Sequence, residues 1–247
     1  MFIDTHCHIH EADYPLPIAD VLQRAADAGV VKMICVGTSE QSSIDAISFA
    51  AQHDNIYATV GVHPHDTKDG YGQIAELAKK DVVAVGEIGL DYYYTHSPRD
   101  VQIAALESQI QTALDNNLPI IFHVRESFDD FLPIFDNFHG IRGELHSFTD
   151  TQANLDKAFE RGLFVGVNGI STFTKDAAQQ ALYAAIPIEK MLLETDAPFL
   201  TPTPHRGTIN ESAFVREIAA HHAALRGMSL NDVATATTTN ATALFDL

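Results

Sequence analysis

The chain has 247 residues, of which 46% are hydrophobic and 19% charged, an ordinary globular balance that excludes intrinsic disorder, collagen-like sequence and coiled coil. Its 33 acidic and 15 basic side chains give a formal net charge of -18, which argues against a broad basic footprint for nucleic acid or an anionic membrane. The chain shows no signal peptide, no apolar run long enough to span a membrane and only two cysteines, so we expect a reduced, cytoplasmic protein.

Short apolar runs alternate along the chain with segments of helical apolar spacing, such as residues 18–25 and 103–114. Nearly continuous apolar runs are typical of strands that are buried on both faces of a parallel sheet. We predict eight strands, at residues 2–3, 30–36, 56–60, 82–85, 118–122, 142–145, 163–167 and 191–193. Eight such βα units predict a (β/α)8 TIM barrel.

A doubly wound open sheet is the structural alternative, but no Gly-rich phosphate loop follows the first strand, which favours the barrel. Residues 229–247 predict one further helix, because Ser229 and Asp232 stand at capping-box spacing before an amphipathic run. We expect this helix to pack on the outer ring. No linker or internal sequence repeat interrupts the chain, so residues 1–247 are interpreted as a single domain.

The first strand leads into two histidines that flank a cysteine. Because side chains alternate along a strand, His6 and His8 face the same way, while Cys7 points toward the helices as a small buried thiol. His-x-His is a weak signal by itself. It gains weight because further polar residues follow other predicted strands, namely His63, His65, Glu87, His123, His146 and Asp196.

In a parallel barrel the carboxyl ends of the strands form one face, so these residues meet around one mouth. Several unpaired polar groups buried together would be costly without a ligand, which favours a metal site. Imidazole and carboxylate ligands without thiolate suit Zn²⁺, Mn²⁺, Fe²⁺ or Mg²⁺. The number of ligands predicts two divalent ions, with Glu87 as the bridge and Asp196 able to accept a proton from water.

The remaining histidines are interpreted as structural. His221 and His222 lie in a helical segment, while His53, His96 and His139 lie in connecting stretches. For His10, just past the first strand, contact with the site stays open.

The motifs resemble those of the TatD family of metal-dependent hydrolases over nearly the whole chain. The matching segments are 4–8 (DTHCH), 61–65 (GVHPH), 86–93 (GEIGLDYY), 123–125 (HVR) and 194–198 (ETDAP). The resemblance implies a TIM barrel with two divalent metals, Zn, Mn or Mg, and DNase activity on single-stranded DNA, commonly from the 3′ end.

The same resemblance implies roles for individual residues. One metal would be held by His6, His8, Glu87 and Asp196, and the second by Glu87, His123 and His146. Asp196, Glu87, His63 and Asp91 would be catalytic, and His63, His65, Arg125 and Arg206 would bind substrate.

Two segments depart from the family pattern. Residues 146–150 (HSFTD) place Asp150 where the family usually has glycine, and we expect it to cap the following helix rather than to weaken a polyanionic substrate. Residues 205–211 look like the family's loop after the last strand, but Thr208 and Ile209 replace a more basic pair. The chain has no tryptophan and no aromatic-basic stripe, so no stacking platform is predicted.

The leading hypothesis is a two-metal phosphodiesterase acting on DNA ends, with no membrane and no obligate protein partner. The alternative is an amidohydrolase or esterase on the same barrel, including D-aminoacyl-tRNA deacylation. Related amidohydrolases often bridge their metals through a modified lysine after the fourth strand; here Glu87 holds that place, and Lys79 and Lys80 precede the strand. A noncatalytic metal store fits poorly, because Asp196 and an open coordination position would serve no purpose.

Overall fold

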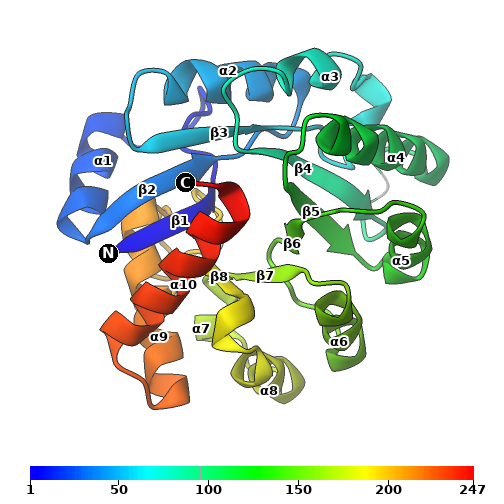
Figure 1. Cartoon of the computed structure of the whole chain (residues 1–247). Coiled ribbons are helices and arrows are strands. Elements are labelled where there is room, and N and C mark those ends of the chain that lie inside the picture. The colour runs from blue at the N-terminus through cyan, green and yellow to red at the C-terminus, as the bar shows by residue number, and fades with distance from the viewer. Residues whose placement is uncertain (95) are drawn as a thin grey trace.

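The structure is a computed structural model that describes residues 1–94 and 96–247. Eight parallel strands follow one another in sequence order around a nearly closed barrel, with helices outside (Figure 1). The strands are β1 (Phe2–Cys7), β2 (Val30–Cys35), β3 (Ile56–Val60), β4 (Ala84–Asp91), β5 (Ile120–Arg125), β6 (Gly143–Leu145), β7 (Phe164–Val167) and β8 (Met191–Leu193). The predicted TIM barrel is confirmed.

The helices follow the strands in the expected alternation, with additional short turns of 3-10 helix. They are α1 (Ile18–Asp27), α2 (Glu40–Ala50), α3 (Ile74–Leu77), α4 (Arg99–Asp115), α5 (Phe128–Asp136), α6 (Gln152–Glu160), α7 (Ile170–Phe173), α8 (Ala177–Ala185), α9 (Val215–Arg226) and α10 (Leu230–Phe245), with η1 (Thr67–Asp69), η2 (Ile188–Lys190) and η3 (Ser212–Phe214). Within the described residues, no helix has the length and apolarity that a membrane crossing requires.

Three strands extend further than the apolar runs predicted. β1 continues to Cys7, β4 to Asp91 and β5 to Arg125, so Glu87 lies within its strand and not just after it. The register continues to the pair Asp91 and Arg125, because backbone ladders form irrespective of side-chain polarity. Polar side chains that end an apolar run can therefore still lie on a strand and face the barrel mouth.

The barrel closes between β1 and β8 with few backbone bonds. The His8 N–H donates to the Ala197 carbonyl at 2.8 Å, and the Asp196 N–H donates to the His6 carbonyl at 2.8 Å. The Asp4 side chain adds to this seam, because it accepts hydrogen bonds from Thr195. The seam therefore places the histidines of β1 directly beside Asp196.

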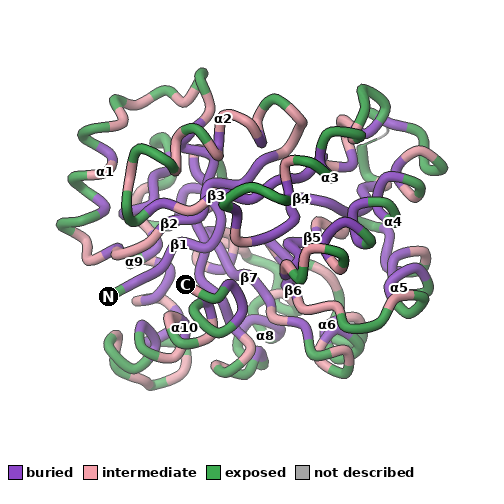
Figure 2. Tube along the Cα trace, turned by 45° about the horizontal axis from the view of Figure 1, so that its top comes forward, coloured by how far each residue is buried: buried purple, intermediate pink, exposed green. Residues whose placement is uncertain are grey.

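Two apolar clusters make up the core, and the strands are largely buried while the helices carry exposed outer faces (Figure 2). The larger cluster lies mainly between strands and helices. The smaller one joins barrel residues such as Ile3, Ile121 and Leu192 to Leu244 and Phe245 of α10.

Helix α10 is therefore not part of the outer ring, and that expectation was wrong. Its predicted N-cap is present, since the Ser229 hydroxyl accepts the Asp232 N–H at 3.1 Å. The Asn240 side chain donates to the carbonyls of Ile188 and Met191, which stand where β8 begins. The helix lies across the end of the barrel where the strands start, opposite the predicted site (Figure 1).

Candidate metal centre

Glu87 lies at the centre of the polar cluster and is only 4% exposed. Its Oε2 is 3.3 Å from His6 Nε2, and its Oε1 is 2.8 Å from His123 Nδ1. The same Oε1 lies 3.5 Å from His63 Nε2 and 3.9 Å from His146 Nε2. One carboxylate thus faces four histidines that come from four different strands.

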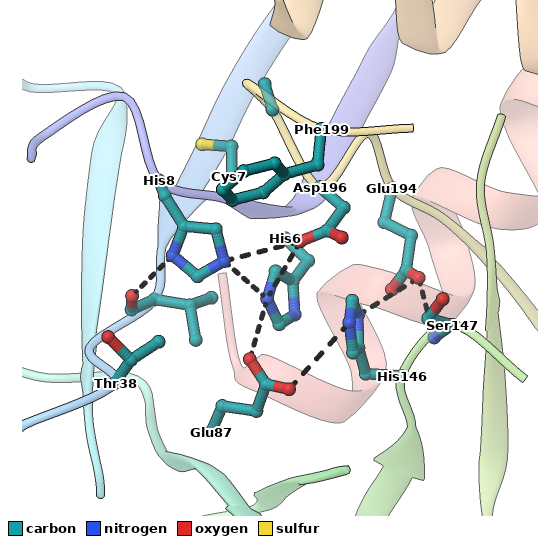
Figure 3. Close-up of polar contacts among 12 residues, drawn as sticks. His6, Cys7, His8, Thr38, Glu87, His146, Ser147, Glu194, Asp196 and Phe199 are labelled. Carbon is teal, nitrogen blue, oxygen red and sulfur yellow. Dashed lines mark hydrogen bonds and ion pairs between the residues drawn. The ribbon is translucent and has the colours of Figure 1, made fainter. Parts of the chain in front are cut away.

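The histidines of β1 converge on a single point beside Asp196 (Figure 3). His6 Nε2 and His8 Nε2 are 3.2 Å apart, and His8 Nε2 is 3.3 Å from Asp196 Oδ1. His8 Nδ1 lies 3.0 Å from the Val36 carbonyl, and when it donates its proton there, the lone pair of Nε2 points into the centre. The fully buried His6 Nδ1 has no hydrogen-bond partner among the described residues.

His146 stacks on His6, with ring centroids 3.6 Å apart, and also contacts the carboxylate of Glu194 (Figure 3). Its Nδ1 lies 3.1 Å from Glu194 Oε1, which also accepts the Ser147 N–H at 2.7 Å. The sequence analysis gave Glu194 no role. Strand alternation could have found it, because Glu194 and Asp196 are two residues apart after β8.

Asp91 organises the other half of the cluster. Its Oδ2 is 3.0 Å from His123 Nε2 and 2.9 Å from His65 Nε2. His63 Nδ1 accepts the backbone N–H of His65 at 3.2 Å. Because Nδ1 accepts this bond, a neutral His63 carries its proton on Nε2. The Nε2–H group then points toward Glu87 as a donor.

The electrostatics of the cluster favour a bound cation. Burial raises the pKa of Glu87, but the surrounding histidines, His146 first, outweigh burial and hold that pKa well below its usual range. For Asp196, burial is outweighed by the hydrogen bond to His8, and the pKa is lowered. Burial keeps the pKa of His63 well below its ordinary value, so this ring is neutral. Two ionised carboxylates thus lie in a buried place beside His146 and His123, whose pKa values the neighbouring carboxylates raise against the effect of burial, so a bound metal ion would replace the protons of these rings.

The side chains fit divalent metal ions in both geometry and chemistry. Nitrogen and oxygen donors converge without thiolate, which suits Zn²⁺, Mn²⁺ or Mg²⁺. Three groups bring their ligand atoms within 4.8 Å of one another: His6, His8 and Glu87; His6, His146 and Asp196; and His63, Glu87 and His123. The sequence analysis had paired His146 with His123, whereas these groups place His63 beside His123.

A cavity of about 730 Å³ opens over the cluster, and His65, Arg125 and Thr149 are among its lining residues. Arg206 is not among them: its guanidinium lies over the Phe173 ring at 3.8 Å and donates to the Thr201 carbonyl at 2.7 Å. The structure thus brings Arg125 to the site and leaves Arg206 away from it.

The cavity also has an aromatic rim that the sequence analysis missed. Tyr94 and Phe199 line it, although no stacking platform was predicted. Strand and helix periodicity gives no information on side chains in the turns after the strands. An aromatic residue three positions beyond a predicted catalytic carboxylate, as in Asp91 to Tyr94 and Asp196 to Phe199, is the one signal that was present.

The remaining candidates lie outside the cluster. His10 Nε2 is 3.1 Å from the Ser42 hydroxyl, and His10 belongs to none of the three groups. Cys7 is a buried free thiol whose Sγ donates to the Ile34 carbonyl at 3.4 Å. Asp150 accepts the Thr151 N–H at 2.6 Å next to α6, but Thr151 is the N-cap residue itself. The expectation that Asp150 caps α6 was therefore wrong, because Thr151 is the N-cap.

Two residues of the site adopt backbone conformations that cost free energy. Asp196 has φ of 57° and Ser147 has φ of 49°, in the left-handed region that non-glycine residues seldom adopt. Each costs on the order of 1–3 kcal/mol and persists where the surroundings impose it, commonly at functional sites.

Comparisons with known proteins agree with this geometry. A family model described as TatD related DNase matches residues 3–246. The uncharacterized metal-dependent hydrolase YabD of Bacillus subtilis is 34% identical over 252 residues, covering 99% of this chain and 99% of that protein. The 3′-5′ ssDNA/RNA exonuclease TatD of Erwinia tasmaniensis is 35% identical over 240 residues, covering 92% of this chain and 93% of that protein. The crystal structure of YJJV, a TatD homolog from Escherichia coli K12, matches with a TM-score of 0.91 at 28% identity, covering 100% of this chain and 98% of that chain.

Proposed function

Because the chain belongs to the family of TatD-related DNases and is a metal-dependent hydrolase, we propose that it cleaves phosphodiester bonds of single-stranded DNA from the 3′ end. The observation that carries the proposal is the position of Glu87, one carboxylate shared between His6 and His8 at the end of β1 and the pair His63 and His123, which come from the turn after β3 and from β5. A shared carboxylate between two ligand groups suits a pair of divalent ions acting at phosphorus. The exonuclease of Erwinia tasmaniensis supports the substrate class.

We propose two divalent ions, of Zn, Mn or Mg. His6, His8, Glu87 and Asp196 would hold the first, and Glu87, His123 and His146 the second. Bound there, such ions supply an activated water and stabilise charge on the phosphate oxygens.

The protein's own groups would do the rest. Asp196 turns Oδ1 toward the histidines, which leaves Oδ2 to accept the proton of the attacking water. His63, neutral and protonated on Nε2, would donate to an oxygen of the scissile phosphate. Asp91 would hold His123 and His65 in orientation, and Arg125 at the rim would pair with a phosphate.

Two broader features accompany this proposal. We propose that residues 1–247 form one domain, since the barrel and α10 share a core and the family model spans residues 3–246. We also propose a cytoplasmic location, in line with two buried cysteines that are both free thiols.

The direct test is hydrolysis of 3′- and 5′-labelled single-stranded DNA by protein stripped of metal and reloaded with Mg²⁺, Mn²⁺ or Zn²⁺. We expect stepwise shortening from the 3′ end. Asp196→Asn, prepared identically, should be inactive and so exclude a contaminating nuclease. If the reloaded protein leaves DNA intact but hydrolyses an aminoacyl ester or an amide, the phosphodiesterase proposal is wrong and the alternative replaces it.

A further inference from the structure

Exposed aromatic side chains gather at the mouth of the barrel. Among the described residues, six large hydrophobic side chains are exposed, and the three aromatic ones are Tyr93, Tyr94 and Phe199. Phe199 is 59% exposed and Tyr94 is 42% exposed, and both line the cavity over the metal cluster. Large apolar side chains that stay exposed together beside a cavity indicate a surface that binds a ligand.

The two cavity-lining rings stand on opposite sides of the mouth. Tyr94 follows β4 and Phe199 follows β8, and these strands are four apart in the order of an eight-stranded barrel. Glu87 and Asp196 line the same cavity between them. The strand order therefore places one aromatic residue on each side of the cavity that leads to Glu87.

The backbones of both aromatic residues are hydrogen-bonded to residues of the site or of the neighbouring loop. The Phe199 N–H donates to the Asp196 carbonyl at 2.8 Å, and its own carbonyl accepts the Asn210 side chain at 2.5 Å. Figure 3 shows Phe199 on the same turn as Asp196. The Tyr94 N–H donates to Asp91 Oδ1 at 3.0 Å. The backbone of each exposed aromatic residue is thus held by a residue of the site, so that its ring is attached at a fixed point, as a preorganised surface requires.

A cation completes the rim beside Tyr94. The Arg125 guanidinium carbon lies 4.0 Å from the Tyr93 ring centre and 5.0 Å from the Tyr94 ring centre. Tyr93 thereby holds the guanidinium in place by a cation–π contact. On a chain of net charge -18, this places one positive group next to exposed rings. An anion joined to a flat ring, as in a nucleotide, matches the pair.

We propose that Tyr94 and Phe199 form a subsite that stacks the nucleobase at the end of a single-stranded nucleic acid, while Arg125 contacts an adjacent phosphate. The inference rests on the proposed function and adds the recognition of the base. Stacking on aromatic side chains is tolerant of sequence, because every base has a π-face. The subsite therefore selects ends that carry a base over ends that lack one, and discriminates little among the four bases.

The test compares two oligonucleotides that differ only in their terminal nucleotide, one carrying a base and one abasic, with kcat and KM measured for each. We expect the wild-type enzyme to favour the base-bearing end by about tenfold or more in kcat/KM, which is the lower part of the range for one stacked base. Phe199→Ala and Tyr94→Ala should each reduce this preference to within about twofold, with the loss mainly in KM. Phe199→Tyr and Tyr94→Phe keep a ring and should preserve the preference.

Leu225→Ala is the matched control, since Leu225 is 42% exposed on α9 and does not line the cavity. It should leave the preference intact. Equal cleavage of both ends by the wild type, with DNA still hydrolysed, would overturn the base subsite and leave the phosphodiesterase standing. An enzyme that cleaves neither end would overturn both proposals. The comparison within the wild type needs no variant, so it holds even if a substitution impairs folding.

Discussion

The Thr195 hydroxyl donates to Asp4 Oδ2 at 2.7 Å while the Thr195 N–H donates to Asp4 Oδ1 at 2.8 Å, so one carboxylate ties the last strand to the first. Both residues are fully buried, and burial raises the pKa of Asp4 to about 7. The seam has few other bonds, so this side chain takes the place of missing ladder bonds.

We therefore expect Asp4→Ala to destabilise the protein by about 3 kcal/mol, because two buried donors of Thr195 lose their acceptor. Urea unfolding would measure the change in the free energy of unfolding. Asp54→Ala, at an exposed position, should change it by less than about 0.5 kcal/mol. Equal stability of the two variants would mean that the seam does not depend on Asp4.

Glu87→Ala should lower activity by about a thousandfold or more while the barrel stays folded, because stabilisation of charge by bound ions amounts to several kcal/mol. Elemental analysis should show reduced metal content. Glu76→Ala removes a fully exposed carboxylate from α3 and should leave both quantities unchanged. A fully active Glu87→Ala enzyme would refute the shared carboxylate.

Asp196→Asn should retain much of its metal and lose turnover by roughly 10²–10⁴-fold, since the amide keeps one oxygen for coordination but cannot accept a proton. Metal content and kcat are measured on the same preparation. If both ions leave with the substitution, Asp196 acts mainly as a ligand and its role as a base is unsupported.

The stability of the protein should depend on pH through a histidine far from the metal cluster. Burial holds the pKa of His222 well below its ordinary value, helped by Arg226 and His221. Arg226 Nη1 lies 2.7 Å from its Nδ1, and the Ser171 hydroxyl on α7 lies 3.1 Å from its Nε2. Tyr183 on α8 packs against the ring edge.

In the unfolded chain, His222 gains a proton below about pH 6.5, whereas the folded chain keeps it neutral. The stability that His222 contributes is therefore complete above that pH and is lost as the pH falls, by up to about 1.4 kcal/mol per pH unit. His222→Gln should unfold in urea with a shallower loss of stability from pH 7 to pH 5 than the wild type. His139→Gln, at an exposed position, should keep the wild-type slope. Parallel curves for all three proteins would contradict the prediction.

Strand periodicity predicted the parts of the molecule that depend on local alternation. His6, His8 and Glu87 meet because carboxyl ends of parallel strands share one face, and no long-range information was needed to expect it. The length of β4 was underestimated, because the carboxylates Glu87 and Asp91 and the glycines Gly86 and Gly89 interrupt the apolar run although the ladder continues.

What sequence could not give depends on contacts between distant segments. The direction of Arg206 is set by Phe173, more than thirty residues away, and the backbone of Phe199 is held by the side chain of Asn210. The position of α10 depends on which apolar surface stays open after the barrel has formed. An amphipathic helix could pack on the outer ring or on the end of the barrel, and its sequence pattern is the same in both cases. Such choices are made by the assembled fold.

Helix α10 gives the barrel a floor. With Leu244 and Phe245 packed against the barrel residues at the end where the strands begin, that end of the barrel is closed. On the proposed function, the end of a single strand would therefore enter, and the products would leave, by the mouth over Glu87, while the uncut part of the strand would stay outside the rim. Closed circular DNA would then offer the enzyme no end to cleave.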